Sequence, residues 1–219
     1  MIRHLYLCND TVIIRFNIQN SLKCWEEVLD QGKYTYVATV ASDATAVSEF
    51  FIRNGYSQYT LPTVEAEYER GNQFHAIYDG SRIVAGMWIH RGAVDVNAPS
   101  FRALKECRNH VVCFDADTIY SSHNLVEEAY RGKRLYSMLL HNVFRYHQND
   151  FRFYVIITGM DNKKMLNSSL HYMGQVVGYA RTIRLFRIFW IRFPHFFGPL
   201  SWRSEAVNRE QCSKEARDE

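Results

Sequence analysis

Three cationic side chains, Arg131, Lys133 and Arg134, stand close together directly before a segment with the pattern of a helix. The first backbone N–H groups of a helix have no intrahelical acceptor, and the helix dipole is positive at that end. A basic turn that leads into a helix is therefore typical of a site for pyrophosphate. A solvated basic loop has the same composition, and charge alone does not separate the two interpretations.

The elements around this turn follow from periodicity. Apolar residues at helical spacing predict a helix after the turn; they are Leu135, Met138, Leu139, Val143 and Tyr146. Residues 151–158 (FRFYVIIT) predict a strand, and Asp161 or Asn162 can cap a further helix that ends at Gly174. Residues 175–193 predict one or two strands. With the period-two strand at 111–120, this order indicates a mixed α/β fold around one sheet.

The first half of the chain completes that sheet. We expect a strand over residues 34–40, helices over 43–53 and 63–70, and a hairpin of strands 74–78 and 82–90 around Asp79-Gly80. Residues 1–33 are interpreted as an N-terminal extension with a short strand at 10–16 and a short helix at 21–30.

Composition excludes several classes of protein. The chain has 219 residues, 47% of them apolar and 22% charged, which predicts one large folded domain. A formal net charge of +3 gives little support to a nucleic-acid binder. None of the five cysteines lies in a CxxC pair and none of the nine histidines in an HExxH motif, so we expect no metal site. No long uncharged apolar run or signal-peptide pattern is seen, and we expect a cytoplasmic protein.

The segment 125–136 (LVEEAYRGKRLY) resembles the signature of the GNAT superfamily of acyltransferases. That signature is Arg or Gln, two residues, Gly, one residue, then Gly or Ala, and it follows the fourth strand. Asn162 and Gly174 are similar to residues of the last family helix, and the resemblance covers about residues 34–193. It implies a GNAT-like domain over 34–203, with splayed strands four and five, and a polar tail at 204–219.

The resemblance also implies a donor and its binding residues. The donor is acetyl-CoA or another acyl-CoA, or an acyl chain on an acyl carrier protein. The backbone of Leu125 and Val126 is expected to pair with the pantetheine arm and to polarise the thioester. The pyrophosphate is assigned to Arg131, Gly132, Lys133, Arg134, Leu135 and Tyr136, and the remaining donor contacts to Asn162 and Ser168. Arg134 and Tyr136 stand where the family prefers small residues, so an inactive binding protein with this fold is the alternative.

Transfer of an acyl group to a primary amine needs a base for the ammonium proton, and an acid assists the leaving thiolate. The family often places a Tyr acid where this chain has Leu170, and Tyr172 is the nearest phenol. The candidate bases are Glu127, His123 and Asp117, of which Glu127 and His123 are preferred. The predicted activity is that of an N-acetyltransferase, with an amino sugar or amino acid as candidate acceptor and a long-chain acyltransferase as a related alternative.

Residues 181–203 combine five arginines with seven Phe and Trp residues and hold no acidic residue. One interpretation is a last core strand and an extension packed on the domain. A second is a surface that contacts a membrane interface, and a third, stacking on single-stranded nucleic acid, fits the small net charge least. Extended strands near the C-terminus could also pair across a homodimer.

Overall fold

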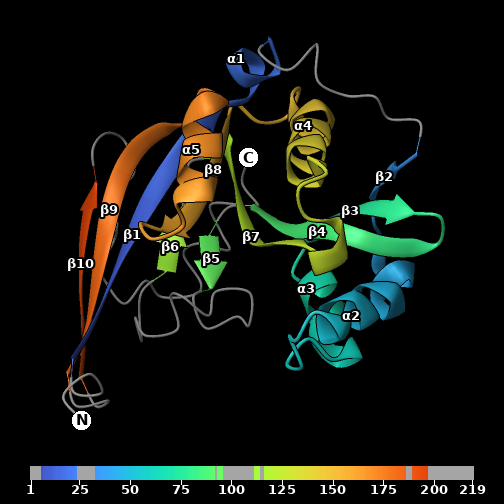
Figure 1. The fold of residues 1–219 in the computed structure, drawn as a ribbon, viewed down its shortest axis with the longest axis horizontal. Coiled ribbons are helices and arrows are strands. Elements are labelled where there is room, and N and C mark those ends of the chain that lie inside the picture. Colours follow the sequence, from blue (N-terminus) through green and yellow to red (C-terminus); the bar gives the residue numbers. More distant parts are fainter. Residues whose placement is uncertain are drawn as a thin grey trace.

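The computed structural model describes residues 6–23, 33–91, 93–95, 111–113, 116–185 and 189–196, with backbone alone at 6–11, 93–95, 111–113, 179–185 and 189–196. Its centre is an eight-stranded sheet in the order β10-β9-β1-β8-β7-β4-β3-β2 (Figure 1). The strands are β1 (Tyr6–Asn17), β2 (Thr35–Ala38), β3 (Gln73–Asp79), β4 (Arg82–Arg91), β7 (Thr118–Val126), β8 (Phe153–Gly159), β9 (Gln175–Leu185) and β10 (Phe189–Phe196). Neighbours in this sheet run antiparallel except β7 and β8, which are parallel, so the mixed α/β prediction is confirmed.

Helices cover both faces of this sheet (Figure 1). They are α1 (Ile18–Lys23), α2 (Ala44–Arg53), α3 (Leu61–Glu69), α4 (Leu135–His147) and α5 (Lys163–His171). Side chains alternate between the faces of a strand, so β4 contributes to two buried clusters. Met87 and Ile89 pack with α4 in one cluster, whereas Trp88 packs with α2 and α3 in the other. Among the described residues, no helix is long and apolar enough to cross a membrane.

Local patterns predicted most of these elements well. The hairpin of β3 and β4, the helices α2 and α4, and the strand β8 lie within about two residues of their predicted bounds. The helix stop at Gly174 is also a close contact: a Cβ there would lie 2.7 Å from the Ser169 carbonyl oxygen and 2.8 Å from Ile14 Cγ2. Gly174 therefore lets the end of α5 pack directly on β1.

Two predictions of elements need correction. The single strand expected over residues 111–120 is wrong, because Val111–Cys113 forms β6, which pairs with β5 (Ala93–Asp95) in a separate two-stranded sheet, and β7 begins at Thr118 after a turn. The strand expected at 10–16 is longer than predicted and lies inside the sheet. β1 pairs with both β8 and β9, so the segment interpreted as an extension supplies a strand between them.

Candidate functional site: a cavity between splayed strands

The parallel strands β7 and β8 separate after three paired residues. Their register runs from Thr118 opposite Phe153 to Tyr120 opposite Val155, whereas β7 continues to Val126 and β8 to Gly159. The separation has a local cause on the other edge of β7. The pairing of β7 with β4 shifts register between Gly86 and Trp88, and opposite this irregularity His123 has a left-handed φ of 51°. A bulge of this kind bends a strand, and β7 has it three residues after its last pair with β8.

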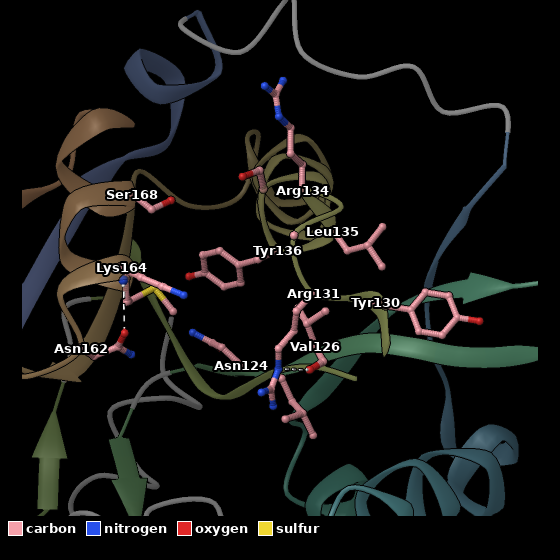
Figure 2. A pocket seen from close by; sticks show the side chains of 14 residues that line it. Asn124, Val126, Tyr130, Arg131, Arg134, Leu135, Tyr136, Asn162, Lys164 and Ser168 are labelled. Carbon is pink, nitrogen blue, oxygen red and sulfur yellow. Dashed lines mark hydrogen bonds between the residues drawn. The ribbon is translucent and has the colours of Figure 1, made fainter. Parts of the chain in front are cut away.

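A cavity of about 560 Å³ opens where the two strands separate (Figure 2). It is lined by Asn124, Leu125, Val126, Tyr130, Arg131, Gly132, Arg134, Leu135, Tyr136, Ser137, Asn162, Lys164, Met165 and Ser168. The lining thus comes from the end of β7, the turn that follows it, the first turn of α4 and the start of α5. All the donor-binding residues expected from the sequence belong to this lining except Lys133, whose ammonium lies 4.6 Å from the centre of the Tyr130 ring.

The turn before α4 presents backbone donors and positive charge to this cavity. Gly132 and Arg134 both have positive φ values, 79° and 59°. Arg134 is the N-cap of α4 and makes no side-chain capping hydrogen bond, while its carbonyl accepts the first helical bond, from Met138. The N–H groups of Leu135, Tyr136 and Ser137 precede that bond and belong to residues that line the cavity. With the exposed Arg131 and Arg134, they form a site suited to an anion.

The comparisons with known proteins rest on structure. No protein-family model and no curated protein matches the sequence. A tandem GNAT protein from the clavulanic acid biosynthesis pathway superimposes with a TM-score of 0.55 at 12% identity, over 88% of this chain and 55% of that one. A GNAT-family acetyltransferase from Colwellia psychrerythraea gives a TM-score of 0.53 at 11% identity, over 87% and 57%. This chain has the GNAT fold.

A conserved protein of unknown function from Staphylococcus epidermidis gives a TM-score of 0.54 at 13% identity, over 83% of this chain. The chain spans between 53% and 64% of the length of the first four such structures. Within the GNAT fold, β7 and β8 are the splayed pair expected from the sequence. The cavity between them is therefore the place where the sequence analysis expected the acyl donor.

Glu127 does not have the environment of a free base. Its side chain is only 8% exposed and is held by Arg53 at 2.8 Å and Arg82 at 2.7 Å. Burial raises the pKa of the Glu127 carboxyl, but hydrogen bonds from Arg82 and Arg53 outweigh burial and lower it below its ordinary value. Glu127 does not line the cavity; it ties the end of β7 to α2 and β4. The sequence could not show this, because both arginines lie far away along the chain.

His123 lies on the side of the sheet that carries α2 and α3. Its Nδ1 is 3.1 Å from the Tyr59 hydroxyl and 3.3 Å from Ser122 Oγ, and Ser122 Oγ is 2.8 Å from Nε2 of the buried His90. The ring also packs edge-on against Phe51. His123 is half-buried and does not line the cavity. Glu127 and His123, both candidate bases, therefore have different surroundings. Two arginines hold Glu127, whereas His123 contacts the hydroxyls of Tyr59 and Ser122.

Two tyrosines and two asparagines complete the site. The Tyr172 hydroxyl lies 3.0 Å from Oγ of Ser137, a residue of the cavity lining. Asn162 caps α5 by accepting from the N–H of Met165 at 3.2 Å, so it is the cap of the two residues, Asp161 and Asn162, that the sequence left open. Burial raises the pKa of Tyr136, and Asn124 and Tyr154 lie near enough to lower it in part. Neither completes a hydrogen bond of normal geometry to the Tyr136 hydroxyl.

Sequence reasoning missed five of the lining residues: Asn124, Tyr130, Ser137, Lys164 and Met165. Lys164 and Met165 carry a signal that could have found them, since they follow Asn162 by two and three residues in the first turn of the same helix. Asn124 carried none, because the bulge at His123 changes the alternation of β7 and turns the next side chain toward the cavity.

Proposed function

We propose that this chain is an N-acyltransferase that takes an acyl group, foremost acetyl, from acyl-CoA and transfers it to a primary amine. The observation that carries the proposal is the joint placement of the β7–β8 separation and the basic start of α4 on one cavity. Acyl-CoA has an anionic diphosphate at one end, a long polar arm and a thioester at the other. The cavity offers cations and helix N–H groups at one end and unpaired strand backbone at the other.

The donor supplies an activated thioester, and the chain supplies binding and proton transfer. Arg131, Arg134 and the first N–H groups of α4 hold the diphosphate. The backbone N–H of Val126 is then available to the thioester oxygen, because pairing with β8 has ended at Tyr120 and the N–H of the next residue, Glu127, points the other way and donates to the Val84 carbonyl of β4. Aligned donors of this kind stabilise the negative charge that develops when the amine attacks.

The amine approaches from the α2–α3 side in this proposal, and His123 takes its proton. Imidazole is the side chain that most often performs this step in enzymes that work near neutral pH. Glu127 has no catalytic role in this proposal, because its carboxylate is held by Arg53 and Arg82. The departing thiolate has a pKa near 8.5, so it needs little help, and Tyr172 can provide a proton through Ser137.

A second copy of this chain and an acyl carrier protein are proposed as partners. β10 stands at the edge of the sheet, which supports pairing across a homodimer. The side chains that would make the basic aromatic surface at 181–203, and those that would make the polar tail at 204–219, lie outside the described residues. An acyl carrier protein presents the same pantetheine arm as CoA and is compatible with the same cavity.

Binding and turnover of acetyl-CoA test the proposal. Isothermal titration calorimetry should show binding, and Arg131→Ala should weaken it about threefold to tenfold through loss of a charged contact to phosphate. Arg145→Ala is the matched control, because Arg145 is exposed in the last turn of α4. His123→Gln should retain the affinity for acetyl-CoA and lose the release of CoA with an amine panel.

The alternative is a GNAT-fold protein that binds and does not transfer. Arg134 and Tyr136, in place of small residues, are the observation that favours it. Binding of acetyl-CoA without release of CoA for any primary amine would support this alternative. Absence of binding by acetyl-CoA, CoA and longer acyl-CoAs would refute both.

A further inference from the structure

Two buried polar atoms of the cavity lining make no hydrogen bond within the described part of the chain. They are Oδ1 of Asn124, at the end of β7, and the hydroxyl of Tyr136, in the first turn of α4. Figure 2 shows Tyr136 reaching across the cavity from α4 toward α5, with Asn124 directed into the same space from β7. Polar atoms withdrawn from water without a partner are unfavourable, and such atoms on the wall of a cavity are suited to a ligand.

The chemistry of the two atoms is complementary. A tyrosine hydroxyl can donate a proton, and the carboxamide oxygen of asparagine can only accept one. A secondary amide offers the matching pair, a carbonyl oxygen that accepts and an N–H that donates. The pantetheine arm of CoA contains two secondary amides between its diphosphate and its sulfur.

We propose that Tyr136 and Asn124 together bind a secondary amide of the donor's pantetheine arm, with Tyr136 donating to its carbonyl and Asn124 accepting from its N–H. The inference rests on the proposed function, because it takes the cavity to be the donor site. It adds side-chain recognition at two positions, one of which has a small residue in the signature that this segment resembles.

Position along the cavity supports the pairing. Tyr136 is the second residue of α4, immediately next to the N–H groups assigned to the diphosphate, and Asn124 directly precedes Leu125. An arm that runs from the helix start toward the backbone of Leu125 therefore passes between these two side chains. The cavity measures about 560 Å³ with Tyr136 in place, so this ring lines the space and leaves it open.

A tyrosine in the cleft has an opposite interpretation, in which the ring obstructs the arm. The two interpretations predict opposite changes in the affinity for CoA when Tyr136 is replaced. If the hydroxyl binds the arm, removing it weakens the binding of CoA. If the ring obstructs the arm, removing the ring strengthens the binding of CoA.

Calorimetric titration with CoA and with ADP separates them, because ADP has a diphosphate and lacks the arm. Tyr136→Phe and Asn124→Leu should each lower the affinity for CoA about threefold to tenfold and leave the affinity for ADP unchanged. The double variant should lose less than the product of the two effects, since both groups bind one amide. Tyr130→Phe is the matched control, because Tyr130 lines the same cavity but donates its hydroxyl proton to Asp79 at 3.0 Å.

Several results would overturn the inference. Unchanged CoA affinity in Tyr136→Phe and Asn124→Leu would show that neither atom contacts the arm, and tighter binding by Tyr136→Ala would show obstruction. Equal affinity of the parent chain for ADP and CoA would place the arm outside the cavity while leaving the diphosphate site intact. Failure of the parent chain to bind either compound would instead refute the proposed function itself. Circular dichroism of each variant confirms that it is folded.

Discussion

Arg134 occupies a backbone conformation that disfavours every residue with a side chain, so replacing it by glycine should stabilise the protein. Its φ and ψ are 59° and 16°, and its side chain is exposed at the N-cap of α4. A left-handed L-residue costs about 1–2 kcal/mol. Glycine removes that cost but adds freedom to the unfolded chain worth about 0.4–1 kcal/mol. Arg134→Gly should therefore raise the free energy of unfolding by roughly 0.5–1 kcal/mol, the difference between the two effects.

Urea and thermal unfolding measure this gain, which corresponds to an increase in Tm of about 1–4 °C for a chain of this size. Arg134→Ala is the decisive control. It removes the same positive charge from beside Arg131 and Lys133 but retains a Cβ at the strained position. Only the glycine variant should gain stability from relief of strain, while both variants should lose affinity for CoA to the same extent.

Two results would refute the reasoning. If Arg134→Ala stabilises as much as Arg134→Gly, the gain comes from relief of repulsion among the three cations. If Arg134→Gly lowers the free energy of unfolding, the arginine side chain contributes more to the start of α4 than its strain costs. Either result would show that the left-handed φ of Arg134 does not limit the stability of the protein.

Two further predictions concern groups beside the site. Glu127→Gln should lower the free energy of unfolding by about 1–3 kcal/mol, because charged hydrogen bonds are lost, and should leave CoA affinity unchanged. The adjacent, exposed Glu128→Gln should change neither the free energy of unfolding nor the CoA affinity. A turnover defect in Glu127→Gln without a loss of stability would contradict the ion-pair role. Burial lowers the pKa of His90 to about 3 and that of His147 to about 4, with neighbouring charges adding to the effect. Only the unfolded chain then binds these protons between pH 6.5 and 4, so stability should fall as pH is lowered through that window, by about 1.4 kcal/mol per pH unit for each imidazole. Urea unfolding at pH 7, 6 and 5 tests this, with His147→Gln reducing the slope and exposed His171→Gln leaving it unchanged; equal stability at pH 7 and 5 would contradict it.

The candidate site was predictable to the extent that it is local in sequence. The basic turn, the helix that follows it and the capping Asn162 each depend on residues within a few positions of one another. Periodicity and charge therefore placed the turn and its helix, and the resemblance to the GNAT signature assigned most of the cavity lining. Side-chain direction within the lining was not predictable, because the path of Asn124 depends on the bulge at His123.

Long-range pairing set the other limit. The alternation of apolar residues in β1 predicts a strand, but nothing in it shows that β8 and β9 are its neighbours. Glu127 is a sharper case, since its partners Arg53 and Arg82 lie 74 and 45 residues away. A carboxylate at a strand end looks the same in sequence whether it faces a substrate or two guanidinium groups.

The two departures from the small-residue signature have different physical consequences, and this difference bears on function. At position 134 a small residue such as glycine adopts a left-handed φ without strain. Arg134 has that same φ, and its side chain makes the conformation energetically costly. At position 136 a small residue leaves space in the cavity. Tyr136 instead places a buried hydroxyl there, without a hydrogen-bond partner. Strain that the surrounding structure maintains and an unpartnered polar atom are both features that concentrate at binding sites. The strained φ of Arg134 and the unpartnered hydroxyl of Tyr136 therefore both support the proposed donor site at this turn.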